Sequence, residues 1–153
     1  MKLVQAVKRL QFLEKEISEL EEVIDKSLVN KSGTGNIFSP DDCRAKIVDL
    51  MNERRFLKLA IVRTNINTGV KVKKADGAEE QITLQELIYQ IDDNADYMCD
   101  LQRCRDVVLN QEKVENINFD IDSVLKHYEF IKERLQYLQD VFTIVQYKID
   151  LME

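Results

Sequence analysis

The chain has 153 residues, enough for one domain with its own hydrophobic core, and it combines 33% charged residues with only four glycines and one proline. This composition excludes turn-rich sandwiches and disordered tails and favours long helices. The formal net charge of −6, with both signs interspersed, argues against nucleic acid as a partner, because a phosphate backbone binds to basic surfaces.

The N-terminal segment has the character of a helix start and not of a signal peptide. Lys2, Gln5, Lys8 and Arg9 interrupt any apolar run there. No stretch of the chain reaches the roughly 20 apolar residues of a membrane span. Three cysteines are an odd number in a chain without an export signal, so we expect reduced thiols that act as small packing residues. We therefore expect a cytoplasmic protein without a membrane partner.

The first helix is predicted at about residues 2–29, where apolar residues recur every seven positions. Its two seams are Leu3, Leu10, Ile17 and Ile24, and Ala6, Leu13, Leu20 and Ser27. Such a helix is about 40 Å long, since each residue adds about 1.5 Å. This length indicates that other helices lie beside it.

Residues 30–39 contain two glycines and several polar side chains that compete with helical hydrogen bonds, so they are predicted to form a loop. A second helix is predicted at about 40–64, with Ser39 as its N-cap, Pro40 in its first turn and two acids following. It carries two adjacent apolar stripes, which predict that it is covered on more than one side. The stripes are Ile47, Leu50, Leu57 and Ile61, and Val48, Met51, Leu59 and Val62.

Two arginines, Arg54 and Arg55, interrupt these stripes. A buried guanidinium needs a carboxylate, a carbonyl or a ligand anion, because an unpaired buried charge is destabilising by several kcal/mol, about 3–5. The alternative is that each side chain extends past the apolar surface to solvent or to an acid of another subunit.

A small β-hairpin is predicted at about residues 69–83. Val70 to Lys73 alternate in polarity, Asp76-Gly77 supplies a turn, and Gln81 to Thr83 return. Thr83 and Glu86 then form the pattern of a capping box, which predicts a third helix at about 84–110.

A fourth helix is predicted at about 122–152, with Asp120 or Asp122 as its N-cap. Its two seams are Tyr128, Leu135, Phe142 and Ile149, and Ile131, Leu138, Val145 and Met152. The predicted fold is mainly α: one helical domain, 1–153, of four long helices arranged as a bundle or coiled coil, with one hairpin between the second and third helices.

Catalytic and metal-binding motifs are weak in this sequence. His127 is the single histidine and has no recognisable nucleophile or orienting acid nearby in the sequence. Asp92, Asp96 and Asp100 share a helical face, but no Glu-x-x-His pair completes a metal site, and such acids also occur on ordinary solvated faces. The glycines of residues 33–36 lack the lysine of a phosphate-binding loop. We predict no enzyme, no catalytic residue, no metal and no cofactor.

A basic cluster is the strongest candidate binding site. Helix 2 is predicted to end where a positive charge, a hydroxyl and an amide precede the lysines of the hairpin, on an otherwise acidic chain. These groups suit a phosphate or a carboxylate. The predicted ligand-binding residues are Arg63, Thr64, Asn65, Lys71, Lys73, Arg54 and Tyr147, with Lys74 adjoining them. The alternative is that the cations complement the helix dipole and that Asn65 caps the last turn.

The order of elements and several short motifs resemble the septicolysin-like family of small bacterial proteins. The resemblance rests on residues 1–3, 61–67, 76–77 and 120–153, the last including Leu138-Gln139-Asp140. The chain departs from the family at Gln146-Tyr147, where Asn-Trp is expected, and in lacking an arginine after Asp76-Gly77. The resemblance implies a helical fold with a minor hairpin and homo-oligomerisation.

Three functions follow as hypotheses. The first is a non-enzymatic homo-oligomer that captures a small anionic or nucleotide-like molecule between subunits, similar to the sponge proteins by which phages sequester nucleotide signals. The second is a structural module that docks onto other proteins through its helices. The third, a pore-forming cytolysin, rests on the family name alone, and the sequence shows neither an export signal nor an amphipathic membrane hairpin.

Overall fold

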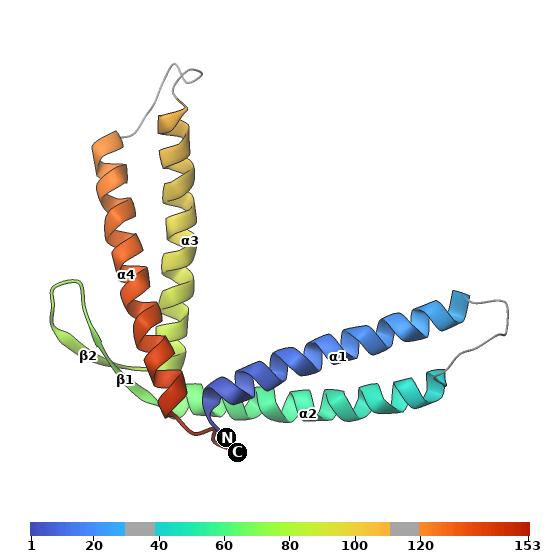
Figure 1. The fold of residues 1–153 in the computed structure, drawn as a ribbon. Coiled ribbons are helices and arrows are strands. Elements are labelled where there is room, and N and C mark those ends of the chain that lie inside the picture. The colour runs from blue at the N-terminus through green and yellow to red at the C-terminus, as the bar shows by residue number, and fades with distance from the viewer. Residues whose placement is uncertain (30–38, 111–119) are drawn as a thin grey trace. The chain divides into compact units, whose positions relative to one another are not determined.

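The computed structural model describes residues 1–29, 39–110 and 120–153. Within these ranges it contains four long helices and a two-stranded antiparallel hairpin (Figure 1). The elements are α1 (Leu3–Val29), α2 (Pro40–Asn67), β1 (Gly69–Lys73), β2 (Glu79–Thr83), α3 (Leu84–Leu109) and α4 (Ile121–Lys148). The predicted mainly helical fold, with its hairpin between the second and third helices, is confirmed. The loop predicted around residues 30–38 lies outside the described residues.

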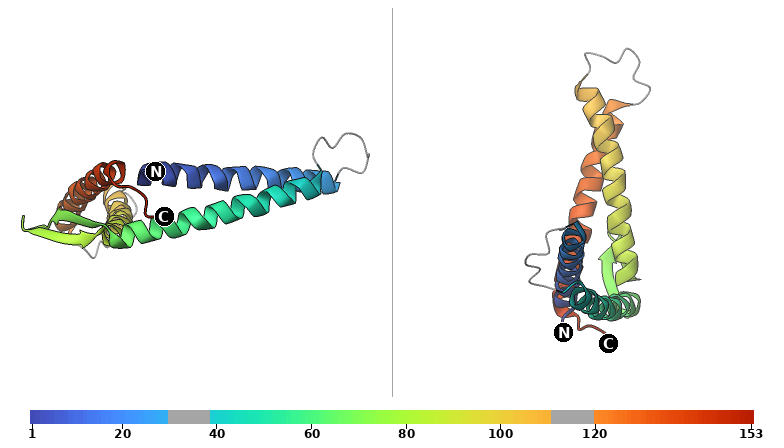
Figure 2. Two further views of the ribbon diagram at one scale, coloured as in Figure 1. Left: turned by 90° about the horizontal axis from the view of Figure 1, so that it is seen from below. Right: turned by 90° about the vertical axis from the view of Figure 1, so that its right-hand side faces the viewer.

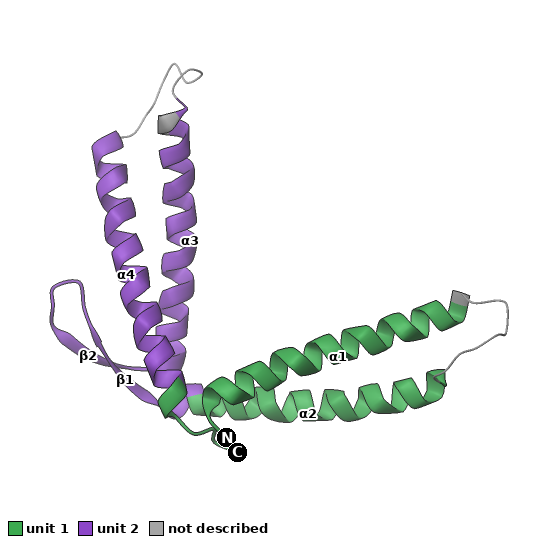
Figure 3. Ribbon diagram, in the orientation of Figure 1, with its two compact units in different colours: residues 1–64, 147–153 green, residues 65–146 purple. Residues whose placement is uncertain are grey.

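The chain divides into two compact units (Figure 3). The first comprises residues 1–64 and 147–153, and the second comprises residues 65–146. None of the described helices is long and apolar enough to cross a membrane.

In the first unit, α1 and α2 run side by side, as the views of Figures 1 and 2 agree. The helices bury one face each, because apolar residues at helical spacing fall on one side of each cylinder. The buried residues are Leu3, Ala6, Leu13 and Ile17 of α1, and Cys43, Ile47, Leu50, Leu57 and Ala60 of α2. Two residues from each predicted seam of α1 and three of the four residues of the first predicted stripe of α2 therefore lie in this core.

Ion pairs join the two helices along the edges of the core. Arg9 Nε lies 2.8 Å from Glu53 Oε1, and the neighbouring guanidinium nitrogen donates to Glu53 Oε2 at 2.9 Å. Lys46 pairs with Glu16 at 2.9 Å, farther along the helices. The hydrogen bonds from Arg9 hold the pKa of the Glu53 carboxyl below its ordinary value, and the same contact raises the pKa of Arg9.

The C-terminal segment corrects the predicted length of the fourth helix. That helix was predicted to reach residue 152, but it ends at Lys148. Beyond it the chain is extended and bridges to the N-terminus, with Leu3 N–H donating to Ile149 O at 3.0 Å and Leu151 N–H to Met1 O at 2.8 Å. These hydrogen bonds replace those of a further helical turn, so neither Ile149 nor Met152 is a helical seam position.

The end of the second helix also differs from its prediction. α2 continues to Asn67, three residues beyond the predicted end at Thr64. Asn65 therefore lies inside the helix and does not cap it. The second predicted stripe of α2 is not covered by the chain's own described residues, because Val48, Leu59 and Val62 are about half exposed, at 55%, 51% and 46%.

In the second unit the hairpin leads directly into α3. Val70 pairs with Ile82 and Val72 with Glu80, and the alternation buries the two valines and Ile82. Gly77 has a φ of 86°, which explains the glycine in this turn. The other buried residues of the unit include Leu84, Leu87 and Leu101 of α3, and Tyr128, Leu135 and Leu138 of α4.

Both helices of this unit begin directly after a residue that the sequence offered as an N-cap. Thr83 is the N-cap of α3, and its hydroxyl accepts a hydrogen bond from the backbone N–H of Glu86 at 3.1 Å. At α4 the cap is Asp120, whose carboxylate accepts from the backbone N–H of Asp122 at 3.1 Å. The sequence left both Asp120 and Asp122 open for this role.

Candidate functional site

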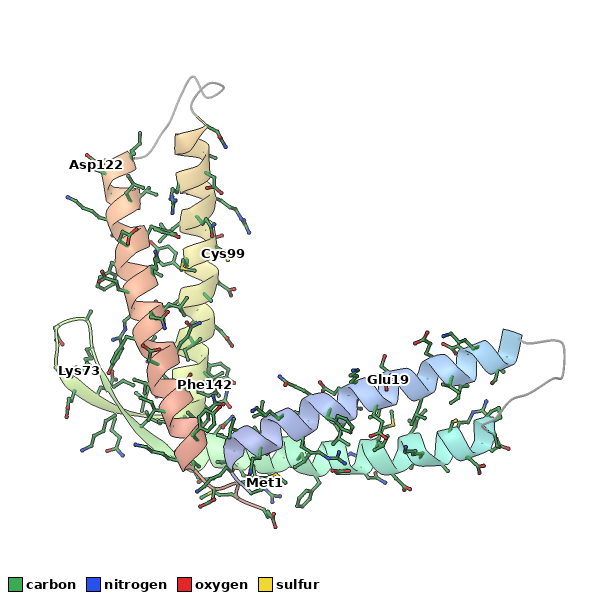
Figure 4. The ribbon with its side chains drawn as sticks, viewed as in Figure 1. Met1, Glu19, Lys73, Cys99, Asp122 and Phe142 are labelled. Atoms are coloured by element: carbon green, nitrogen blue, oxygen red, sulfur yellow. The ribbon has the colours of Figure 1, made fainter. Side chains whose placement is uncertain are left out.

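A basic and aromatic cleft lies where the hairpin meets α4. Figure 4 shows Lys73 on the hairpin, next to the ribbon of α4. The cleft has a volume of about 240 Å³. Its lining residues are Lys73, Lys74 and Ala75 from the hairpin and Phe130, Glu133, Arg134 and Tyr137 from α4. Both contributing elements belong to the second unit, so the site is built within one compact part of the chain.

Two hydrogen bonds hold the hairpin against α4 at this cleft, and a cation–π contact lies within α4 itself. The backbone N–H of Lys73 donates to the Tyr137 hydroxyl at 2.8 Å. The guanidinium of Arg134 donates to the carbonyl of Lys73. The same guanidinium lies 5.4 Å from the centre of the Tyr137 ring, in cation–π range. Arg134 and Tyr137 thus fix the end of β1, and with it the position of Lys73.

The charge of the cleft suits an anion. Lys73, Lys74 and Arg134 bring three positive charges, and Glu133 brings one negative charge, so the lining has an excess of two positive charges. The lysine ammonium groups are flexible point charges that bind phosphate and carboxylate oxygens. Phe130, half exposed at the rim, offers an apolar surface on which a flat ring can stack.

The predicted site residues do not all reach this cleft. Lys73 lines it, and Lys71 lies two positions earlier on the same exposed face of β1. Arg54 lines a separate hollow on α2, of about 360 Å³, with Met51, Lys58 and Val62 among its neighbours. The other predicted residues are exposed Arg63 on α2 and exposed Tyr147 in the last turn of α4.

Two predicted site residues have structural contacts instead. Thr64 is fully buried, at 0% exposure; its hydroxyl donates to Ala60 O at 2.8 Å and accepts from Met152 N–H at 2.9 Å. Asn65 is buried, and its side-chain amide lies 3.5 Å from the Gln85 side-chain oxygen. Because these polar atoms are engaged within the chain, we place neither residue in the cleft.

Phe130, Arg134 and Tyr137 line the cleft but were not among the residues predicted from the sequence. Their spacing of four and then three residues puts them on one face of α4, next to the predicted apolar seam. That spacing is a sequence signal, but nothing local indicates that the hairpin packs against this face.

A second hollow lies between α3 and α4, with a volume of about 590 Å³. Apolar side chains line one part of it, and carboxylate and amide side chains line the rest. The lining residues are Ile88, Ile91, Asp92, Gln136, Gln139, Asp140, Phe142, Thr143 and Gln146. Within the group, Gln136 donates to Asp140 at 2.9 Å. This acidic groove therefore has the opposite charge to the hairpin cleft.

The remaining candidates bring together fewer groups. His127 is exposed, and its Nδ1 lies 3.5 Å from the Tyr97 hydroxyl. Across the part of the chain that the structure describes, no three His, Cys, Asp or Glu side chains are placed to hold a metal ion. Asp92, Asp96 and Asp100, which share a helical face in the sequence, are among the residues that form no such group.

Comparisons with known proteins give a likeness of fold. No family model matches the chain, and no curated protein matches it by sequence. A solved structure from Corynebacterium diphtheriae, described as a functionally unknown conserved protein, is similar at a TM-score of 0.82 with 16% identity, over 99% of this chain and 98% of that one. At this identity the likeness shows that the fold is shared and says nothing of function.

Proposed function

We propose that the protein is a non-enzymatic binding protein, acting as an assembly of identical subunits, which captures a small anionic, nucleotide-like molecule. The observation that carries the proposal is the hairpin cleft, where Lys73 and Lys74 stand opposite Arg134 beside Phe130. A cation pair beside an aromatic ring recognises both parts of a nucleotide, the phosphate and the base.

The way the cleft is built supports capture. Tyr137 and Arg134 hold the backbone of Lys73, so one of the binding lysines starts from a fixed strand end and not from a free loop. Holding a binding group in place before the ligand arrives reduces the entropy lost on binding. Glu133, on the same rim, is a hydrogen-bond acceptor for an amino group of a base.

The experiment is titration calorimetry with AMP, adenosine and inorganic phosphate. We expect AMP to bind more tightly than either fragment, because only AMP engages both the cations and the ring. Lys74→Ala should weaken AMP binding by about tenfold, corresponding to one charge-assisted contact of about 1.4 kcal/mol. Phe130→Ala should weaken AMP and adenosine but leave phosphate unchanged.

The matched control is Lys132→Ala, which removes an exposed lysine of α4 that does not line the cleft. If Lys132→Ala and Lys74→Ala weaken AMP binding equally, the effect comes from the net charge of the chain, and the assignment of the cleft is contradicted. AMP, adenosine and phosphate all failing to bind would contradict this ligand class.

A second candidate function is a module that docks onto a helix of another protein. The observation in its favour is the exposed stripe of α2, where Val48, Leu59 and Val62 are uncovered in the single chain. Exposed apolar residues that follow one face of a helix mark an interaction surface. Association of the purified protein only with itself would favour the assembly of identical subunits over this candidate.

A further inference from the structure

The outer face of α2 combines apolar residues with positive charge. Its stripe consists of Val48, Leu59, Val62 and Ile66, all about half exposed, with Arg55 among them on the same side of the helix. Arg54 stands at the edge of this stripe, in the hollow that Leu59 and Val62 also line. In the described parts of the chain, neither Arg54 nor Arg55 has an ion-pair partner, whereas Lys58 pairs with Glu14 at 3.1 Å.

This composition restricts what can cover the face. Two copies of the α2 face packed on each other would bring arginines together, and like charges at an interface are destabilising. An apolar surface without acids would leave the guanidinium groups desolvated and unpaired, which is also unfavourable. The partner surface must therefore offer both apolar groups and carboxylates.

The acidic groove between α3 and α4 has this chemistry. Ile88, Ile91 and Phe142 provide its apolar part, and Asp92 and Asp140 provide carboxylates. Asp92 has no ion-pair partner among the described residues, and the contact of Asp140 is with the neutral amide of Gln136. Its volume of about 590 Å³ is large enough for several side chains of an incoming helix.

We propose that the protein self-associates by placing the outer face of α2 from one copy in the acidic groove of a second copy. The apolar stripe covers Ile88, Ile91 and Phe142 of the second copy, and Arg54 and Arg55 pair with its Asp92 and Asp140. Each chain carries both surfaces, so every copy can offer its α2 face to one neighbour and its groove to another face of the same kind. This inference rests on one part of the proposed function, the assembly of identical subunits. It does not depend on the anion cleft, which uses other residues.

The experiment exchanges the charges of the two surfaces. One variant carries Arg54→Glu and Arg55→Glu, and the other carries Asp92→Lys and Asp140→Lys. Each should self-associate at least about tenfold more weakly than the unmodified chain in sedimentation velocity, because both surfaces then have the same charge. An equimolar mixture should restore association, since the unchanged face of each variant fits the unchanged face of the other, and the two reversed faces are complementary.

Two controls separate this interface from other effects. Helical circular dichroism of each variant should match that of the unmodified chain, because all four positions are at least partly exposed. Lys8→Glu with Lys15→Glu, on α1, lowers the net charge by as much as the two arginine substitutions do and should leave association unchanged.

The mixture decides the outcome. Restored association in the mixture supports the paired surfaces. Variants that associate as strongly as the unmodified chain, or a mixture that stays dissociated, would overturn the interface. An unmodified chain that is monomeric at every concentration would overturn both the interface and the oligomeric part of the proposed function, whereas loss of AMP binding alone would overturn only the ligand assignment.

Discussion

At the scale of single residues, Thr64 joins the end of the chain to α2. Its buried hydroxyl bonds to Ala60 O and to Met152 N–H. Thr64→Val keeps the shape of the side chain and removes both hydrogen bonds, so it should lower the free energy of unfolding by about 1–3 kcal/mol, the range for leaving a buried polar partner unpaired. Urea denaturation measures the loss. Thr64→Ser, which keeps the hydroxyl, should be affected less, and equal losses would show that the methyl group matters more than the hydrogen bonds.

The pair of Arg9 and Glu53 predicts a pH dependence of stability. Its hydrogen bonds lower the pKa of Glu53 in the folded chain relative to the unfolded chain. Protons therefore bind more tightly to the unfolded state, and the stabilisation is present above about pH 4.3, the ordinary pKa of glutamate, and is lost as the pH falls through the lower folded value. We expect Glu53→Gln to be less stable than the unmodified chain at neutral pH.

The measurement is urea denaturation of both proteins from neutral to acidic pH. The difference in unfolding free energy between them should shrink as the pH falls, because protonation removes the charge that the variant already lacks. Lys26 gives a matched comparison, since it lowers the pKa of Glu22 on α1 by an i, i+4 contact. Glu22→Gln should show the same trend with a smaller amplitude, as expected for a pair within one exposed helix. A constant difference across the pH range would contradict the role of the Glu53 carboxylate.

At the scale of elements, the hairpin depends on α4 for its position. An isolated two-stranded hairpin is only marginally stable in water. Tyr137→Phe removes the hydroxyl that accepts from Lys73 N–H at 2.8 Å, so the Lys73 amide should lose protection in hydrogen exchange while amides in the middle of α4 keep theirs. Tyr89→Phe, which alters an exposed tyrosine of α3, should leave the Lys73 amide unchanged. Equal protection in both variants would contradict the anchoring role of Tyr137.

Most elements could be predicted from the sequence because their signals are local. The seams of α1, the caps at Thr83 and Asp120, and the alternation of β1 depend on residues a few positions apart. The end of α4 could not, because the extended segment after Lys148 is set by hydrogen bonds to Met1 and Leu3 at the other end of the sequence. Nothing near residue 148 signals that pairing.

The candidate site was predictable to a smaller extent. The lysines of the hairpin stood out against an acidic chain, and Lys73 does line the cleft. The polar residues at the end of α2 had the same character of a binding site in the sequence. In the structure, however, Thr64 and Asn65 are buried, and their polar atoms bond within the chain. Arg134 was missed because its role depends on the carbonyl of Lys73, which is 61 residues away.

At the scale of the whole molecule, the exposed apolar stripe of α2 predicts a stability that depends on protein concentration. Binding that occurs only between folded chains shifts the folding equilibrium by mass action. The thermal midpoint should therefore rise as the chain concentration is increased from the low to the high micromolar range. Differential scanning calorimetry measures it, and a midpoint independent of concentration would show that folding and association are not coupled.

The same surface gives a sharper prediction through Leu59, which is 51% exposed on α2. Leu59→Gln removes apolar area that a partner would cover, while the core of the single chain does not contain this side chain. We expect the concentration dependence of the midpoint to disappear, and the midpoint at the lowest concentration to change little. Ile144→Gln is the matched control, because Ile144 is 55% exposed on α4 and lines neither the cleft nor the acidic groove. If both substitutions abolish the concentration dependence, association follows general surface hydrophobicity; if only Leu59→Gln does, the outer face of α2 is the surface that joins the subunits.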